Sequence, residues 1–239
     1  MTAVYRGGTP IVAVYRGEKV VWQKTWLDEQ ESNAIKAKFT ATATMTPSST
    51  TFDGSAITSK VEVGAAYNGT AVKADSVTCP TLGSFTYNES TKKWSVNKTI
   101  ALTDGIGTER VGESHTITIK YTHPTYGEMT TTKTVNFTTY IPSAIMTQAS
   151  TPTAAQIAAA EKMQRLTGTH EIAFNTGDYV YFVVPMAVTI SKITSSGFDV
   201  PFTKVTDSLT VTMGGKNIYM RIYRTTSKPQ TSPMNVVIS

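Results

Sequence analysis

The 239-residue chain has little cysteine, little charge and no long hydrophobic run. Cys79 is the only cysteine, so no disulfide can form within the chain, and we expect a buried structural thiol in a protein that folds in a reducing compartment. No apolar stretch approaches the roughly 18 residues of a membrane span. Charged side chains interrupt the first 25 residues, so these do not form a signal peptide. We therefore expect a soluble protein, made and folded inside a cell, without a membrane partner.

Charged residues make up 16% of the chain, whereas about a quarter is usual. The net charge of +5 is spread along the sequence without a basic stripe, so we expect no nucleic-acid partner. Threonine is abundant instead, with 43 residues. This β-branched residue suits the solvated face of a strand. The composition therefore predicts a mainly β protein whose outer faces are polar rather than charged.

Residues that could carry catalysis or hold a metal form no recognisable pattern. The histidines His115, His123 and His170 stand at no metal-ligand spacing from one another or from Cys79. The sequence contains neither a Gly-Xaa-Ser-Xaa-Gly elbow nor a phosphate-binding Gly-Lys-Ser/Thr loop. Nothing favours any two of the scattered aspartates as the facing carboxylates of a glycosidase. We expect no enzyme, no catalytic residues, no metal and no cofactor.

The chain opens on a doubled phrase, because Ala-Val-Tyr-Arg-Gly occurs twice within the first 17 residues. We expect Val4–Arg6 to pair with Val12–Arg16 as a hairpin, and Val20–Trp22 to be added after a second turn. Two or three strands of this length are marginal in water by themselves. Residues 1–26 are therefore predicted to be an anchoring arm whose apolar faces need a partner surface. An edge hairpin of the following domain is the alternative.

Residues 27–34 gather three acidic side chains without apolar periodicity, which predicts a solvated linker. Alternation of apolar and polar residues begins after it, and a hairpin is expected around a turn at Asn88–Thr91. About seven short strands separated by turns are typical of an immunoglobulin-like β-sandwich, predicted here for residues 35–142. The alternating runs lie at 37–45, 59–67, 83–102, 115–124 and 130–140.

Residues 143–239 are predicted to form a C-terminal β domain with one α-helix, at about 152–167. Thr151 can cap this helix, Pro152 suits its first position, and Gly168 can end it. The run Tyr179–Pro185 is apolar throughout, so we expect a strand covered on both faces. The expected strands are 179–185, 188–194, 209–213, 216–225 and 234–239.

The C-terminal third resembles a module of fibre and adaptor proteins from tailed phages that infect Bacteroides-like gut bacteria, including the crAss-like group. The resemblance lies in the Thr-Pro-Thr start of the Ala-rich segment, in "YVYFVVP", in "ITSSGFDVPFTK" at 193–204 and in "IYMRIYRTTSKPQT" at 218–231. The leader "IVAVYRGEKVVW" at 11–22 is similar to that of many surface proteins of this lineage.

This resemblance implies a non-enzymatic structural protein of the virion, made in the host cytoplasm. It would be a fibre, decoration or adaptor subunit, homo-oligomeric and most often trimeric, attached to capsid, neck or tail proteins. The anchoring contacts would fall to five side chains of the arm, namely Tyr5, Arg6, Tyr15, Arg16 and Trp22.

The run 216–225 predicts a subunit interface. Its residues Tyr219, Arg221 and Tyr223 share one strand face, opposite the face of Ile218. Tyrosine and arginine are enriched at interface centres, so we expect these three around a threefold axis. A solvated face, or an intrachain pair with an aspartate, is the alternative.

A receptor- or carbohydrate-binding module, of a phage tail or a bacterial surface protein, is the alternative function. In it, exposed aromatics such as Trp94, Tyr126 or Tyr219 would stack on the sugars of a host-surface glycan. Ordinary strand packing is the other reading of each of these rings. The missing signal peptide disfavours a bacterial adhesin.

Overall fold

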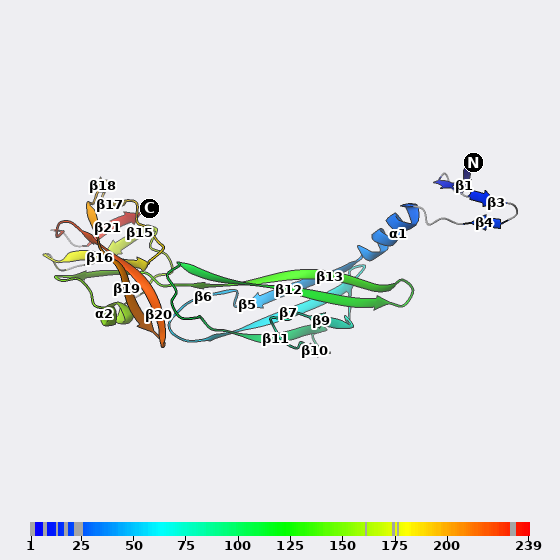
Figure 1. Ribbon diagram of the computed structural model, residues 1–239, viewed down its shortest axis with the longest axis horizontal. Helices are drawn as coiled ribbons and strands as arrows, with labels where there is room; N and C mark the ends of the chain where they lie inside the picture. The colour runs from blue at the N-terminus through cyan, green and yellow to red at the C-terminus, as the bar shows by residue number, and fades with distance from the viewer. Residues whose placement is uncertain are drawn as a thin grey trace. The chain divides into compact units, whose positions relative to one another are not determined.

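The computed structural model describes the backbone of residues 3–6, 9–12, 14–16, 19–21, 26–229 except 161, 174 and 176, and 233–239, with side chains from residue 30 onward. Over these residues the chain is mainly β, with 21 strands and two helices, which confirms the predicted class (Figure 1). It divides into two compact units. Unit 1 comprises residues 1–44, 62–96 and 116–134, and unit 2 comprises residues 45–61, 97–115 and 135–239.

Two separate hairpins open unit 1. Strand β1 (Ala3–Arg6) pairs antiparallel with β2 (Thr9–Val12), and β3 (Val14–Arg16) pairs with β4 (Lys19–Val21). The second hairpin agrees with the prediction, although Trp22 lies outside the described residues. The predicted partner of the first strand is wrong, because β1 pairs with residues 9–12 and not with 12–16. This pairing leaves two residues between the strands, the commonest hairpin connection.

Helix α1 (Trp26–Lys36) occupies the segment predicted as a linker. Residues 30–34 are exposed, as a solvated segment should be, but they are helical. Lys36 lies in the last turn, where its positive charge complements the helix dipole. This charge and good helix formers such as Glu31 and Ala34 compensate for the missing apolar stripe.

Two sheets follow. One has the order β10–β11–β7–β5, with β8 also paired to β7, and the other has the order β6–β13–β12–β9. Every predicted alternating run contains a strand, and β10 pairs with β11 around the expected turn, with Tyr87 opposite Trp94. The strands are β5 (Phe39–Thr46), β6 (Ser49–Thr51), β7 (Ile57–Tyr67), β8 (Thr70–Val72), β9 (Ser76–Thr78), β10 (Thr86–Asn88), β11 (Lys93–Ile100), β12 (Arg110–His123) and β13 (Gly127–Tyr140).

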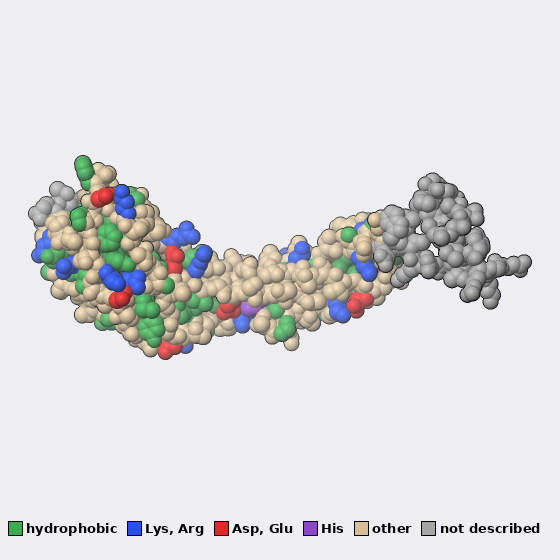
Figure 2. All heavy atoms as spheres, turned by 45° about the horizontal axis from the view of Figure 1, so that its top comes forward, with side chains coloured by type: hydrophobic (Ala, Val, Ile, Leu, Met, Phe, Trp, Pro, Cys, Tyr) green, Lys and Arg blue, Asp and Glu red, His purple; other side chains and the backbone are tan. Residues whose placement is uncertain are grey.

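Alternation along these strands places the inward residues in the core. Val61 and Val63 of β7 and Ile117 and Ile119 of β12 are fully buried, while Lys60 beside them is exposed and Thr118 is half-buried. On the face shown in Figure 2 most of the surface is neither hydrophobic nor charged, in agreement with the expected polar exterior.

Unit 2 contains two further four-stranded sheets. One has the order β14–β16–β20–β19, in which β19 and β20 form a long hairpin, and the other has the order β15–β21–β17–β18 (Figure 1). Strand β21 lies between β15 and β17 and pairs antiparallel with both. The strands are β14 (Ala144–Gln148), β15 (Gly168–Ile172), β16 (Tyr179–Pro185), β17 (Ile193–Ser195), β18 (Phe198–Asp199), β19 (Phe202–Met213), β20 (Lys216–Thr225) and β21 (Met234–Ile238).

Strand β16 joins two hydrophobic cores. Tyr181 and Val183 belong to a cluster with Ile157 of helix α2 (Ala154–Ala159), while Phe182 and Val184 belong to a second cluster with residues of the other sheet. Residues 180–184 are completely buried, which confirms that this strand is covered on both faces.

The predicted helix at 152–167 is wrong in its extent, because α2 ends after six residues. Thr153 caps it rather than Thr151, in a capping box with Gln156. The chain becomes extended at Ala160, and Met163 then exchanges two backbone hydrogen bonds with Ser143, at 2.9 and 2.8 Å. Tertiary pairing therefore overrides the helix propensity of the alanines.

The predicted strand at 188–194 is also largely wrong, because β17 begins at Ile193. The Val188 N–H instead donates to the Pro185 carbonyl in a turn at 2.8 Å, and Ile190 is buried in the second cluster. The other predicted strands of unit 2 are present, β16 and β20 with their expected bounds.

Candidate functional site

The predicted anchoring residues lie on the N-terminal hairpins or beside them. Tyr5 and Arg6 belong to β1, and Tyr15 and Arg16 belong to β3, whereas Trp22 lies outside the described residues. The side chains of all five also lie outside the described set. Each hairpin is a sheet of two strands that pairs with no other strand of the described chain.

A row of five rings runs through unit 1 from the core to the surface. It consists of Phe39, Tyr121, Tyr67, His123 and Tyr126, and we call it the aromatic row. Its successive centroids are 5.4, 6.3, 4.5 and 4.7 Å apart. The first ring, Phe39, is 5% exposed and the last, Tyr126, is 50% exposed. The row therefore ends in a ring that is supported from beneath and open to solvent.

Local backbone structure fixes the outer rings. Tyr126 lies in the turn between β12 and β13, where the N–H of Thr125 donates to Nδ1 of His123 at 3.1 Å. This hydrogen bond makes Nδ1 the acceptor, so the neutral imidazole carries its proton on Nε2. Tyr67 also contacts His123, with centroids 4.5 Å apart, and partial burial there raises the pKa of the Tyr67 phenol. The His123 ring thus contacts two tyrosine rings.

A groove lies beside Tyr126, between the β12–β13 turn and helix α1. Its volume is about 270 Å³, and it is lined by Glu31, Ser32, Ile35 and Lys36 together with Tyr126. The helix thus contributes one carboxylate, one hydroxyl and one ammonium group around an aromatic ring. Sequence reasoning singled out Tyr126 but missed the groove, because the lining helix was not predicted.

The other two rings considered for stacking are less available. Trp94 is half-buried and packs on Tyr87, whose ring also lies 4.4 Å from Nζ of Lys73. Tyr219 is half-buried, and its ring packs over Gly105. Of the three, Tyr126 presents the largest free ring surface.

The three residues predicted as an oligomer interface have different environments. Tyr223 is 5% exposed and packs edge-on against Phe202, with centroids 5.8 Å apart, inside the second hydrophobic cluster. It has no surface to offer to a second subunit, so its assignment to the interface is wrong. The physical reason is the second sheet, which covers this end of β20. Tyr219 and Arg221 stay partly accessible.

Arg221 forms the intrachain pair that the sequence left as an alternative. Its Nε donates to Oδ1 of Asp207 at 3.0 Å, and Lys204 Nζ reaches the same oxygen at 3.0 Å. The guanidinium is therefore oriented along β19 by a carboxylate shared between two cations.

We expect the pKa of the Asp207 carboxyl to lie below its ordinary value, first because of the hydrogen bond from Lys204 and then because of the charges of Lys204 and Arg221. The pair stabilises the fold above the unfolded-state pKa, and this contribution is lost as the pH falls through the folded-state pKa. The carboxyl carbon-13 shift of Asp207, followed by NMR, reports the midpoint. Lys204→Gln should raise that midpoint, and an unchanged midpoint would contradict the shared hydrogen bond.

Two of the histidines and the cysteine make contacts within the chain. His115 is 4% exposed with Nε2 3.3 Å from a Glu113 carboxylate oxygen, and His170 Nε2 lies 2.6 Å from the Leu166 carbonyl. Cys79 is buried, as expected, with Sγ 3.2 Å from the Thr81 hydroxyl. Among the described residues, no group of three His, Cys, Asp or Glu side chains could hold a metal ion.

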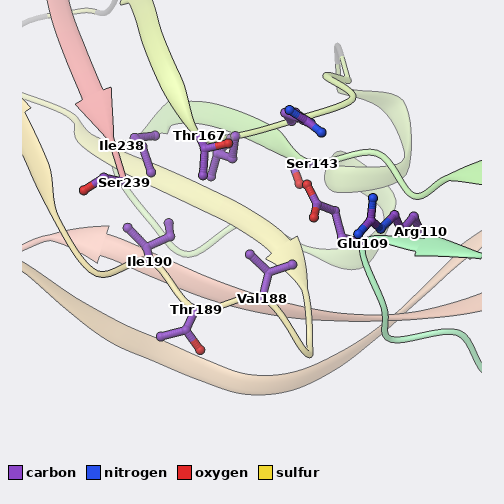
Figure 3. A pocket seen from close by; sticks show the side chains of 11 residues that line it. Glu109, Arg110, Ser143, Thr167, Val188, Thr189, Ile190, Ile238 and Ser239 are labelled. Atoms are coloured by element: carbon purple, nitrogen blue, oxygen red, sulfur yellow. The ribbon is translucent and has the colours of Figure 1, made fainter.

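A small cavity of about 170 Å³ lies in unit 2 (Figure 3). Glu109, Arg110 and Ser143 approach it from one side, and Ile190 and Ile238 from the other. It is smaller than the roughly 300–1,000 Å³ of typical ligand sites. Glu109 is the one acidic side chain in its lining, so no pair of acidic side chains faces each other there as in a glycosidase.

No helix within the described part of the chain combines the length and the apolar character needed to cross a membrane. Comparison of the chain with protein-family models, with curated proteins and with solved structures finds no match.

Proposed function

We propose that this chain is a non-enzymatic structural protein of a phage virion, a fibre, decoration or adaptor subunit held on the particle by its N-terminal arm. The observation that carries the proposal is the pair of isolated hairpins β1–β2 and β3–β4. Strands of three or four residues in two-stranded sheets are marginal in water, so they need a surface from elsewhere. The sequence Val-Tyr-Arg occurs once in each hairpin, so the same three residue types are available twice for contact with that surface.

The proposal assigns an immunoglobulin-like sandwich to residues 35–142, which are divided between the two compact units, and a C-terminal domain to residues 143–239, which belong to unit 2. The two middle sheets, of five and four strands and mostly antiparallel, support this assignment. Such domains project side chains on a rigid frame, which suits a surface protein of a particle.

The assembled form is proposed to be a homo-oligomer, most simply a trimer, in contact with capsid, neck or tail proteins. Tyr219 and Arg221 remain the proposed contact residues on β20, because both are partly accessible. The aromatic ring and the planar guanidinium gain much from desolvation at an interface.

Removal of the arm should abolish attachment and leave the β domains folded. A chain of residues 37–239 lacks both the arm and helix α1, keeps Lys38, whose carbonyl accepts from the Asn68 N–H at 2.9 Å, and begins just before β5. Co-sedimentation with particles of the phage that encodes the chain measures attachment, and circular dichroism with thermal melting measures the fold. We expect no co-sedimentation and a melting temperature close to that of the full chain.

Point variants provide the matched control. Tyr5→Ala with Tyr15→Ala should weaken co-sedimentation, whereas Asn33→Ala on the exposed part of α1 should not. Binding of the shortened chain at full strength would refute anchoring by the arm. Loss of its β signal would show instead that the arm belongs to the core.

A second candidate function is a receptor- or carbohydrate-binding module. The half-exposed Tyr126 at the end of the aromatic row favours it, since a braced ring next to polar side chains can stack on a sugar.

A further inference from the structure

We propose that the groove between α1 and the β12–β13 turn binds one neutral hexose ring of a glycan, stacked on Tyr126. The inference deepens the second candidate function by naming its site and ligand class. It does not depend on attachment by the arm. All of the lining residues belong to unit 1.

The platform is one free face of the Tyr126 ring. The other face stacks on His123, with an interplanar angle of 29° and centroids 4.7 Å apart. The ring is half exposed, so its outer face can accept the apolar C–H face of a pyranose. Aromatic faces carry negative charge, which favours contact with the weakly positive C–H groups of a sugar.

The platform is ordered before any ligand arrives. His123 contacts the rings of both Tyr67 and Tyr126, and the Thr125 N–H donates to its Nδ1 and orients the imidazole. A tyrosine alone on a turn would lose side-chain freedom on binding, which lowers affinity. The stack removes much of this cost, because the ring is already packed.

The rim of the groove matches the hydroxyl groups of a sugar. The Glu31 carboxylate accepts hydrogen bonds, the Lys36 ammonium donates them, and the Ser32 hydroxyl does both. A ring of alternating hydroxyls needs both kinds of partner at short spacing. Residues 31, 32, 35 and 36 lie on one side of a helix, because they are separated by steps of one, three and four.

Size and charge select a single neutral ring. The volume of about 270 Å³ lies below the roughly 300–1,000 Å³ of sites for drug-sized ligands, so one ring enters and the rest of the glycan stays outside. The lining carries one negative and one positive side chain, and it therefore does not select an anion.

The test uses the full chain and an immobilised panel of glucose, galactose and mannose oligosaccharides, with saturation-transfer NMR on those that bind. We expect binding to at least one neutral oligosaccharide. Tyr126→Ala should weaken it about tenfold, since a stacked ring contributes up to about 1.5 kcal/mol. Tyr126→Phe should retain it because the ring stays, and Glu31→Gln should weaken it.

A matched control is Phe198→Ala, which removes a ring that is 78% exposed in unit 2 and should leave binding unchanged. Absence of binding by the wild-type chain would overturn both the groove and the second candidate function. Wild-type binding that Tyr126→Ala leaves intact would overturn the groove alone. Binding to an RNA oligonucleotide in place of the sugars would overturn the ligand class.

Discussion

Gly214→Ala should destabilise unit 2 by about 3 kcal/mol, the largest effect we expect from adding a single methyl group. Gly214 has a φ of +54° in the β19–β20 turn, and a Cβ there would collide with the carbonyl oxygen and Cα of Gly54. Gly54 itself has a φ of +103°, and a Cβ on it would lie 2.7 Å from Gly214 Cα. Because both neighbours are backbone atoms, no side-chain rotation can relieve the collision.

Thermal or urea unfolding measures the loss, and Gly215→Ala is the matched control. Gly215 has a φ of +73° in the same turn, but a Cβ there meets no heavy atom within 4 Å. It should cost about 1 kcal/mol from backbone strain. Equal losses for the two variants would mean that the contact between the loop after β6 and the β19–β20 turn contributes nothing to stability.

Tyr223→Ala should destabilise unit 2 by about 3 kcal/mol, since truncation of a buried aromatic ring removes its burial and leaves a cavity. Tyr223 belongs to the second hydrophobic cluster and packs edge-on against Phe202. Urea unfolding should show the loss at any protein concentration. A melting temperature equal to that of the wild type would contradict the burial of this ring.

Tyr223→Ala cannot test the proposed oligomer, because a destabilised chain can also lose its oligomeric state. A variant outside the core is needed for that test. Arg221→Ala removes a partly accessible guanidinium outside the core, and its sedimentation velocity reports the proposed interface. A shift from oligomer to monomer with little change in melting would support the contact. Sedimentation identical to that of the wild type would remove Arg221 from the interface.

The strands of this chain were predictable because their signal is local. In β5, Phe39, Ala41 and Met45 are buried while the threonines between them are exposed, so the period of two survives folding. The turn between Tyr87 and Trp94 was predictable for the same reason. The prediction failed where pairing with a distant residue determines the backbone conformation. Met163 was predicted to be helical, but its backbone is hydrogen-bonded to Ser143, 20 residues earlier in the chain.

The candidate site also has one feature that the sequence could predict and others that it could not. The exposure of Tyr126 could be expected from its turn between two strands. The aromatic row could not, because its rings come from β5, β7, β12 and the turn, and no single window of sequence contains them. The burial of Tyr223 was missed because alternation on β20 predicts one covered face, while a second sheet covers part of the other.

The place of β21 sets an order of events during synthesis. Strand β15 ends at Ile172, and its partner β21 begins at Met234, about 60 residues later. A ribosome adds about 5–20 residues per second, so on the order of several seconds pass between the synthesis of β15 and that of β21. During this time the edge of β15 that pairs with β21 is unpaired. Until β21 enters between them, β15 and β17 cannot form one sheet. Translation that stalls within this interval would release a chain whose open strand edges invite aggregation.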